Sequence, residues 1–518
     1  MKTYDVIVIG AGNGGLAAAA ECARAGLSTL LLERHNIPGG SATSFVRGRF
    51  EFEPSLHELA GSNDQPDDDS ASRLFKRINA DCEFLNHEST FRLVVPAKDY
   101  DKDAFVNDDG VKVYIDARMP IGFEEFSRKL DELVPGSYES ARKAFDLSIR
   151  MFDVLNSLGD VSKIPPQLKN FPDILRMGAY TINEVLDTLG MPKKAQDIFN
   201  TYWCYLGVPG SKLDFLYYMA MLYSYVKNGT SIPRMRSHEM SLALDKVIRD
   251  NDGEIWYNSE VTKVVMKNGR PAGVVINGDK TVYAKRFICN SSPNKVFRDL
   301  FNINDVPERQ LKMLNARKTA VTLTTVYLGM NKTIDELGIK DYSTFIAPVS
   351  DSDEQFSLIS DFFSGYCIIN CLNKIIPDCT PEGTSQLFLT TMTKGDVMKD
   401  VKPEDYKKFK TKVAEDMIKT CEKALNISIT PYIEEIEIAL PPTFARYLNT
   451  PLGTPYGYML EKWDSMLPRT IQFEADQPFD NFIFCGASQE RGDGYYSAYY
   501  TGEKAAKLTI KALNGEGK

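Results

Sequence analysis

The sequence predicts an α/β protein in which a domain with a parallel sheet is interrupted by a second domain of the α+β type. Three observations support this fold class. The chain starts with an apolar strand-like run and closely spaced glycines, its middle shows apolar residues at helical spacing, and its end repeats a strand, glycine and helix series. Because 518 residues exceed one simple core, we expect two or three domains.

The first element is a run of Val and Ile at residues 4–9, which is typical of a buried parallel strand. Gly10, Gly12 and Gly15 follow in the spacing G-x-G-x-x-G. Glycine at these positions allows a tight turn, the approach of a pyrophosphate to the backbone, and close packing of the next helix. We predict that helix over residues 16–25.

A second strand, over residues 28–32, leads to Glu33, which lies 23 residues after Gly10 (33 − 10). An acidic side chain at this place can accept hydrogen bonds from a ribose hydroxyl. Because strand, glycines, helix, strand and acid occur in this order, they predict a dinucleotide-binding site. The alternative is an ordinary glycine turn in an α/β domain.

Two further stretches carry a family resemblance. Pro38-Gly39-Gly40-Ser41 offers a second close approach of the backbone to a long cofactor, and Gly48-Arg49-Phe50-Glu51-Phe52-Glu53 follows. This arrangement resembles the FAD-binding start of the phytoene desaturase-like flavoproteins. That group includes carotenoid desaturases, carotenoid cis-trans isomerases and retinol saturases, and it is related to the amine oxidases. The family more often has Asp where Glu53 stands.

Two later segments resemble the same family. A helix with Ser237 as its predicted N-cap and a strand meander are similar to the second FAD segment, in which Val261 would meet the adenine and Asn290 would lie in the closing loop. Residues 481–487 and Gly492-Asp493-Gly494 resemble the last segment, where a helix starts beside the flavin. The partial positive charge of a helix N-terminus suits an anionic reduced flavin.

The resemblance implies a glutathione reductase-like FAD-binding Rossmann domain assembled from discontinuous segments, with an α+β substrate or cap domain. The FAD-binding domain would take residues 1–100, 232–304 and 441–518, and the substrate domain would take 101–231 and 305–440. FAD is the expected cofactor. The residues expected to bind it are Gly10, Gly12, Asn13, Gly14, Gly15, Glu33, Arg34, Gly39, Gly40, Ser41, Val261, Asn290, Gly486, Asp493, Gly494 and Tyr495.

Four residues are candidates for catalysis. Glu53 and His57 follow the glycine pair, and histidine exchanges protons near neutral pH, as alkene chemistry can need. Tyr495 and Tyr496 stand at the helix start expected beside the flavin, where their bulk favours a shorter apolar substrate over a full-length carotenoid. The competing interpretations are a loop histidine bonded to the backbone and tyrosines that pack a domain interface.

Residues 199–225 are rich in aromatic side chains, including Phe215, Tyr218 and Tyr225 on one helical face. Aromatic residues at helical spacing form domain cores, and tyrosine also suits the wall of an apolar tunnel because it has one polar tip. Both interpretations stay open at this point.

Composition limits the partners. The net charge of −9 without a basic stripe argues against nucleic-acid binding. Nine scattered cysteines indicate reduced core residues and no metal site. With no apolar run of about 18 residues and a strand from residue 4, we expect a cytoplasmic protein without a membrane span, and peripheral membrane contact stays open. No second G-x-G-x-x-G precedes an acid, so electrons would come from or go to an external donor or acceptor.

The sequence is compatible with three functions. The first is a flavin oxidoreductase or isomerase that acts on carbon–carbon bonds of a hydrophobic, isoprenoid or lipid-like substrate by desaturation, saturation or isomerisation. The second is an amine or amino-acid oxidase, which would need a polar clamp that the sequence does not place. The third is a flavin-binding protein without turnover. The substrate, the direction of the reaction and the oligomeric state are not readable from the sequence.

Overall fold

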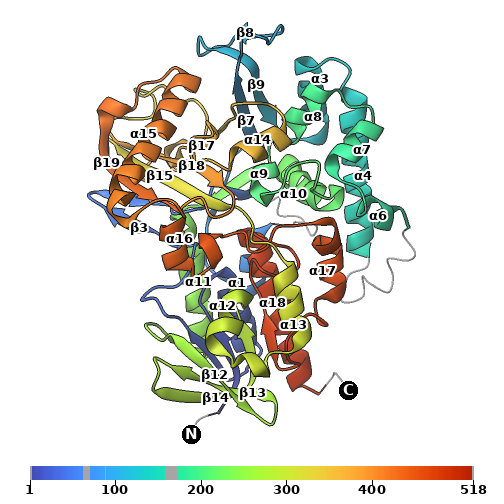
Figure 1. Cartoon of the computed structure of the whole chain (residues 1–518), viewed down its shortest axis with the longest axis vertical. Helices are drawn as coiled ribbons and strands as arrows, with labels where there is room; N and C mark the ends of the chain where they lie inside the picture. The colour runs from blue at the N-terminus through green and yellow to red at the C-terminus, as the bar shows by residue number, and fades with distance from the viewer. Residues whose placement is uncertain (1–2, 62–69, 88, 158–171, 516–518) are drawn as a thin grey trace.

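The computed structural model describes residues 3–61, 70–87, 89–157 and 172–515. Two halves are stacked along the long axis of the molecule (Figure 1). The lower half holds both chain ends and a seven-stranded sheet, and the upper half holds an eight-stranded sheet with helices on its flanks. Among the described residues, no helix combines the length and apolar character needed to cross a membrane.

The lower sheet has the strand order β11-β2-β1-β14-β13-β12, with β20 paired to β14. Strands β1, β2, β11, β14 and β20 pair in parallel, and β12 to β14 form an antiparallel meander. The strands are β1 (Thr3–Ile9), β2 (Thr29–Leu32), β11 (Glu254–Trp256), β12 (Val261–Lys267), β13 (Arg270–Ile276), β14 (Lys280–Cys289) and β20 (Phe482–Phe484).

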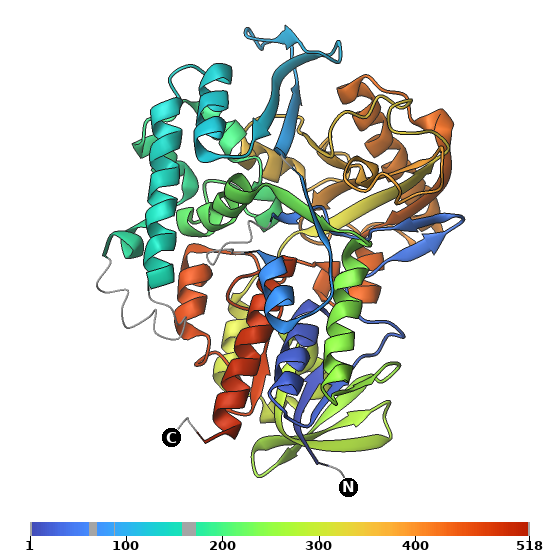
Figure 2. The same ribbon diagram turned by 180° about the vertical axis from the view of Figure 1, so that it is seen from behind.

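Helices cover one face of this sheet, and Figure 2 shows three of them side by side. They are α1 (Asn13–Arg24), α11 (Arg236–Asp250) and α18 (Tyr495–Leu513). Because side chains alternate along a strand, Val6 and Val8 pack into the helical layer, whereas Ile7 and Ile9 pack into the core that the meander closes. Fully apolar strands of this kind are typical of a sheet covered on both faces.

The upper sheet has the order β19-β15-β18-β17-β16-β7-β9-β8 and is mainly antiparallel. One parallel pair, β16 with β7, joins its two parts. The strands are β7 (Ser89–Pro96), β8 (Phe105–Val106), β9 (Lys112–Pro120), β15 (Thr322–Met330), β16 (Ser343–Ile346), β17 (Cys367–Asn370), β18 (Ser385–Thr393) and β19 (Ile433–Ala439).

Two helical groups flank the upper sheet (Figure 1). Helix α15 (Tyr406–Leu425) packs on the strands through Val413, Met417 and Cys421. On the other side, several helices share one core that is rich in aromatic side chains. They are α3 (Phe123–Leu133), α4 (Tyr138–Ser157), α6 (Pro172–Met177), α7 (Ile182–Thr188), α8 (Lys193–Phe199), α9 (Trp203–Leu206), α10 (Phe215–Asn228) and α14 (Ser352–Leu358).

Short elements connect the two halves. A small sheet of β5, β10 and β6 lies where the chain passes between them. The remaining elements are β3 (Phe45–Arg47), β4 (Phe50–Phe52), β5 (Leu59–Ala60), α2 (Ala71–Ile78), β6 (Phe84–His87), β10 (Thr230–Pro233), α12 (Pro293–Lys295), a π-helical turn (Val296–Leu300), α13 (Glu308–Ala316), α16 (Pro441–Leu448), α17 (Met466–Gln472) and six 3-10 turns (Ile303–Asp305, Leu372–Lys374, Pro403–Asp405, Thr430–Tyr432, Pro451–Gly453 and Lys462–Asp464).

The predicted fold class is confirmed, and two local expectations change. Strand β7 pairs with β9 and β16 of the upper sheet, although residues up to 100 were expected in the lower domain. Ser237 is not an N-cap, because α11 starts at Arg236 after Met235. The Ser237 hydroxyl instead donates to a Glu53 carboxylate oxygen (2.9 Å) and to the Thr43 carbonyl (3.2 Å).

The close packing of α1 against α18 generates a stability prediction. A Cβ atom on Gly502 would lie 2.1 Å from the Gly14 carbonyl oxygen, so the two helices would have to move apart. We expect Gly502→Ala to lower the free energy of unfolding by about 1–3 kcal/mol, the usual cost of overpacking. Urea unfolding followed by circular dichroism measures this change.

The matched control is Lys507→Ala, which changes an exposed residue of the same helix and should leave the unfolding midpoint unchanged. An equal midpoint for Gly502→Ala and the unsubstituted protein would contradict the packing argument.

Candidate functional site

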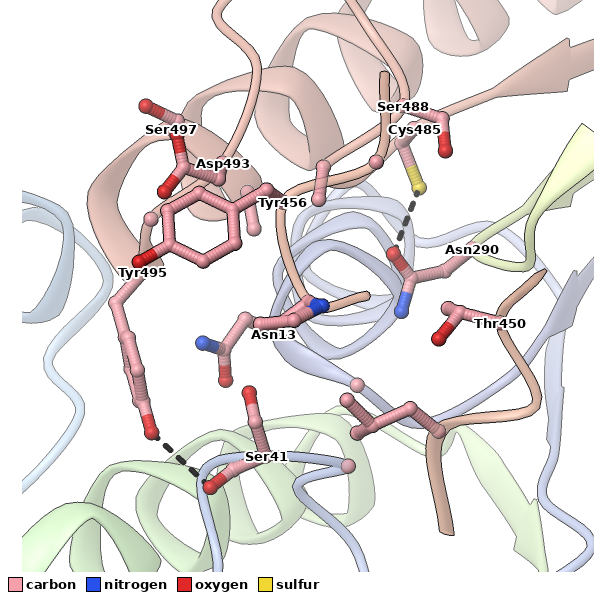
Figure 3. A pocket seen from close by; sticks show the side chains of 18 of the residues that line it. Asn13, Ser41, Asn290, Thr450, Tyr456, Cys485, Ser488, Asp493, Tyr495 and Ser497 are labelled. Atoms are coloured by element: carbon pink, nitrogen blue, oxygen red, sulfur yellow. Dashed lines mark hydrogen bonds between the residues drawn. The ribbon is translucent and has the colours of Figure 1, made fainter. Parts of the chain in front are cut away.

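A cavity of about 510 Å³ extends from the lower sheet into the upper half. Its walls come from the loops after β1, β2 and β14, from the start of α18, and from helices α9 and α10. Segments far apart in the chain therefore meet around one space. Figure 3 shows part of this wall, with Asn13 and Asn290 between Ser41 on one side and Ser488 on the other.

Parallel pairing explains why these segments meet. Ile9, Cys289 and Phe484 occupy matching positions at the carboxyl ends of β1, β14 and β20. Ligands of open α/β sheets bind outside this edge. The residues just beyond it, Gly10 and Asn290, line the cavity, and the Asn290 N–H donates to the Ile9 carbonyl (2.8 Å).

Most of the predicted cofactor residues lie on the cavity wall. The structure brings together there Gly10, Gly12, Asn13, Glu33, Arg34, Gly39, Gly40, Ser41, Val261, Asn290, Asp493, Gly494 and Tyr495. Gly14, Gly15 and Gly486 do not line the cavity. A Cβ at Gly15 would lie 1.9 Å from the Gly10 carbonyl, and one at Gly486 would lie 2.3 Å from Asn290 Oδ1. These three glycines therefore serve packing.

The second glycine pair folds back onto the first turn. The Gly39 N–H donates to the Ala11 carbonyl (2.7 Å), and Gly12 and Gly39 form an isolated parallel bridge. Gly39 has a φ of +118°, which only glycine adopts readily. A Cβ at Gly40 would lie 3.3 Å from the Gly12 Cα. The two stretches thus form one continuous backbone surface without side chains.

Glu33 has contacts that the sequence did not indicate. One carboxylate oxygen accepts from the Ala11 N–H (2.7 Å), and the other accepts from the His35 N–H (2.8 Å). The buried carboxylate therefore ties the glycine turn to the end of β2 while it borders the cavity. Next to it, the Arg34 guanidinium donates to the carbonyls of Arg446 (2.5 Å) and Tyr447 (3.0 Å).

The residues of α9, α10 and their neighbours that line the upper part of the cavity are mostly apolar or aromatic, and we call this part the arm. The aromatic residues of the stretch 199–225 divide between the two predicted roles, the wall of an apolar cavity and the core of a domain. Tyr205, Tyr217 and Tyr225 line the arm, whereas other aromatics of residues 199–225 are fully buried in the core. The apolar side chains of the arm are Phe152, Leu206, Ala220, Met221, Leu323 and Met466.

His57 borders the cavity with its ring stacked against Tyr205 (centroids 5.9 Å apart) and Phe388 (5.5 Å apart). Its Nε2 atom is buried and has no hydrogen-bond partner in the described part of the chain. Burial lowers the pKa of His57 to about 4. The imidazole is therefore neutral at physiological pH.

Glu58, next in the chain, also lines the cavity, although it was not among the site residues predicted from the sequence. One carboxyl oxygen accepts from the hydroxyls of Tyr202 and Tyr205 (both 2.9 Å), and the other is buried and unpartnered among the described residues. Burial raises the pKa of Glu58 to about 8, against the lowering effect of the two hydroxyls. No sequence pattern marks this residue, because its environment comes from α9.

Glu53 has a different place from the one expected. It is buried but does not line the cavity. Its carboxylate accepts hydrogen bonds from the Ser55 and Leu56 N–H groups and from the N–H and hydroxyl of Ser237. Because all these partners belong to the protein itself, Glu53 holds the turn before His57.

Both tyrosines proposed at the start of α18 line the cavity. The Tyr495 hydroxyl donates to the Ser41 carbonyl (3.0 Å) and lies 2.9 Å from the Ser55 hydroxyl, so it links α18 to two loops (Figure 3). The Tyr496 ring lies under the Arg491 guanidinium, 5.4 Å from its centroid. Tyr495 is thus fixed by hydrogen bonds, whereas Tyr496 contacts the Arg491 guanidinium.

Asp493 is a further carboxyl group on the cavity wall, in addition to those of Glu33 and Glu58. Burial raises its pKa well above the usual range for aspartate. It does not cap α18, whose N-cap is Gly494. After burial, the charge of Asp493 is the next cause that raises the pKa of Tyr217 and of Tyr456. Among the described residues, no three histidine, cysteine or acidic side chains gather in a metal-binding group.

Comparisons with known proteins agree with this geometry. Residues 8–78 match the family model of an NAD(P)-binding Rossmann-like domain. Prolycopene isomerase 2 of an Oncidium hybrid cultivar is 22% identical over 550 aligned positions, which cover 100% of this chain and 85% of that protein. All-trans-retinol 13,14-reductase of Danio rerio is 22% identical, with 94% of this chain and 82% of that protein covered.

A solved structure of a putrescine oxidase variant has the same fold, with a TM-score of 0.62 at 14% identity and coverage of 98% of this chain and 99% of that one. At this identity, the likeness concerns the fold alone. The two enzymes similar in sequence over nearly the whole chain, the Rossmann-like start and the shared fold confirm the resemblance to the phytoene desaturase-like flavoprotein oxidoreductases that was drawn from the sequence.

Proposed function

We propose that the protein is an FAD-dependent oxidoreductase or isomerase acting on carbon–carbon double bonds of a hydrophobic polyene. One observation carries the proposal: a single cavity runs from a backbone surface of glycines to an apolar arm. The first part suits a dinucleotide, and the second suits an apolar chain. Relatives whose names are prolycopene isomerase and retinol 13,14-reductase support this substrate class.

The residues present fit FAD. Gly10, Gly12, Gly39 and Gly40 leave room along the backbone, and Glu33 borders the same space. We assign the pyrophosphate to the glycine surface, the adenine side to Val261, and the flavin side to Ser41 and Gly494. FAD, when bound, supplies exchange of hydride or electrons with a carbon–carbon bond. An external donor or acceptor completes the cycle.

The arm suits an uncharged substrate. With pKa values of about 4 for His57 and about 8 for Glu58, both groups are neutral near pH 7. The raised pKa of Asp493 acts in the same direction. A polyene can enter a neutral, largely apolar arm without the cost of desolvating a charged side chain. The same arm excludes bulk water from the reacting bond.

An amine oxidase is the second candidate, because putrescine oxidase has the same fold and carboxyl groups, among them Glu58 and Asp493, line the cavity. An ammonium substrate would need ionised carboxylates, and the burial of Glu58 and Asp493 disfavours that state. The two sequence relatives described above are named as an isomerase and a reductase. We therefore rank the polyene above the amine.

The test is anaerobic absorption spectroscopy of the purified yellow protein with candidate polyenes and amines. We expect a polyene either to bleach the oxidised flavin bands or to restore them after reduction, or to be isomerised by the reduced protein, as chromatography of the recovered polyene would show. No spectral or chemical change with any polyene, together with bleaching by an amine, would overturn the proposal in favour of the amine oxidase.

A second prediction tests the cofactor position. The Ser41 side chain lines the cavity and lies on the same side of Asn13 as the Tyr495 hydroxyl (Figure 3). Ser41→Trp should fill the flavin space and give a folded, colourless protein. Cooperative thermal unfolding checks the fold, and flavin absorbance per protein checks the cofactor. Ser357→Trp, the same change at an exposed site, should stay yellow. A yellow Ser41→Trp protein would contradict the assignment.

The raised pKa of Glu58 generates a third prediction. The folded state holds this proton more tightly than the unfolded state, where the pKa is about 4.5. The stabilising contribution is therefore full below pH 4.5 and is lost as the pH rises through about 8. Glu58→Gln should remove about 5 kcal/mol of this pH dependence, from a pKa rise of about 3.5 units at 1.4 kcal/mol per unit.

Urea unfolding of both proteins at several pH values from about 5 to about 9 measures the difference. The exposed Glu382→Gln is the control and should keep the pH dependence of the unsubstituted protein. Parallel curves for the Glu58→Gln protein and the unsubstituted protein would show that the Glu58 pKa is not raised.

A further inference from the structure

The loop before α18 places one carboxyl group where the two parts of the cavity meet. Asp493 stands between Gly492 and Gly494, whose φ angles of +64° and +98° favour glycine. Gly494 borders the part of the cavity that we assign to the flavin. On the other side lie Tyr217 and Tyr225 of the arm, whose pKa values are raised mainly by burial and further by the nearby charge of Asp493. A reaction between cofactor and substrate needs a place of this kind.

The Asp493 carboxyl group is open to the cavity and is not used by the fold. Apart from its own N–H group, it has no hydrogen-bond or ion-pair partner in the described part of the chain. It differs in this from His57 Nε2 and one Glu58 oxygen, which are closed to solvent. Asp493 keeps an intermediate exposed fraction, although burial is the main cause of its raised pKa. Its exposed surface therefore faces the cavity that it lines (Figure 3).

The hydroxyl hydrogens around Asp493 already have acceptors. Four tyrosines that line the cavity donate to oxygens of the protein: Tyr205 to the Glu58 carboxyl group, Tyr217 to the Arg491 carbonyl, Tyr225 to the Glu58 carbonyl and Tyr456 to the Cys204 carbonyl. Their pKa values are raised by burial, so none of them carries a charge. Compared with these groups, the acid of Asp493 is the one whose proton is left for a ligand.

Charge keeps that proton in place. Burial raises the pKa of Asp493, and no lysine or arginine of the described chain acts against it. The guanidinium of Arg491, two residues earlier, lies over the rings of Tyr496 and Tyr500 instead. A buried carboxyl group without a counter-ion is held as the neutral acid, because the carboxylate would lose its hydration. A neutral acid at the junction can donate its proton and then regain it.

We propose that Asp493 is the proton donor of the polyene reaction: its carboxyl group gives a proton to one carbon of the double bond while a hydride reaches the other. The inference rests on the proposed function and adds the residue that carries the proton. In saturation, two electrons arrive with the hydride, which the cofactor supplies and the external donor replaces. The π bond and the acid O–H bond break as two C–H bonds form. The carboxylate regains a proton from water after the product leaves, and desaturation reverses these steps.

The first test is Asp493→Asn, which keeps the size of the side chain without the acid. We expect flavin content and the dissociation constant of a fluorescent polyene to stay unchanged. The anaerobic reaction of the polyene should become about 10²–10⁴ times slower, the usual contribution of a general acid. The exposed Asp400→Asn is the matched control and should react like the unsubstituted protein. An undiminished rate in Asp493→Asn would overturn the proposal.

Chemical rescue distinguishes a proton donor from a packing residue, and it also serves if Asp493→Asn fails to fold. Asp493→Ala leaves space on the cavity wall for a small molecule. Formic acid should restore the rate in proportion to its concentration, whereas formamide has a similar shape without the acid and should not. Equal effects of the two additives, or no effect of either, would contradict the assignment.

Unfolding gives a readout that needs neither turnover nor substrate. The folded state holds the Asp493 proton more tightly than the unfolded state, where the pKa is near 3.8. The stabilising contribution is therefore full below that pH and is lost as the pH rises through the raised pKa. Asp493→Asn should flatten this fall in urea unfolding at increasing pH. Curves parallel to those of the unsubstituted protein would show that Asp493 holds no proton, and the donor would be refuted.

The outcomes separate this inference from the proposed function. Saturation, desaturation or isomerisation of a polyene at the same rate in Asp493→Asn would support the polyene reaction and refute the proton donor alone. No reaction of any polyene with the unsubstituted protein would refute the proposed function, and the donor with it.

Discussion

The structure depends on the tight contact between the glycine turn after β1 and the Asn290 side chain, which leaves no room for a Cβ atom on the turn. Beyond the carboxyl ends of β1 and β14, the Asn290 amide fills the space between two turns, and a Cβ at Gly12 would lie 2.6 Å from its nitrogen. Gly14 and Gly486 pack against the same amide. The glycine turn therefore has a double role: it leaves a free backbone edge toward the cavity, and it makes room for the Asn290 side chain, which also lines the cavity.

This arrangement also brings the chain ends together. Helix α18 lies against α1 because Gly502 and Gly14 allow backbone contact, and the same helix brings Tyr495 to the cavity. The Tyr495 hydroxyl then reaches the Ser41 carbonyl. One packing constraint between the first and last helices thus sets the position of the loop that we assign to the flavin, which explains why segments so far apart in sequence form one site.

The sequence predicted the lower half well, because local patterns define it. Spacing identified Gly10, Gly12, Gly39 and Gly40, and the structure places all four on one wall. For the upper half, only the fold class was predicted. Its strand order depends on pairs such as β7 with β16, whose partners lie some 250 residues apart, and hydrophobic periodicity carries no information on partners at that separation. Glu58 was missed for the same reason: its pKa and contacts come from tyrosines of a distant helix.

Glu53 and Glu58 show how one short turn couples the two halves. Glu53, buried beneath the cavity wall, holds the N–H groups of Ser55 and Leu56 and the start of α11, all in the lower half. Tyrosines of the upper half hold the carbonyls of the same turn, with Tyr342 on His57 and Tyr225 on Glu58.

The turn is therefore fixed from both sides, and it presents its next two side chains to the cavity. The carboxylate that the sequence suggested for chemistry positions the turn, and the carboxyl group five residues later belongs to Glu58, which lines the cavity. A change at Glu53 should then act through the placement of His57 and Glu58 rather than through loss of a reacting group.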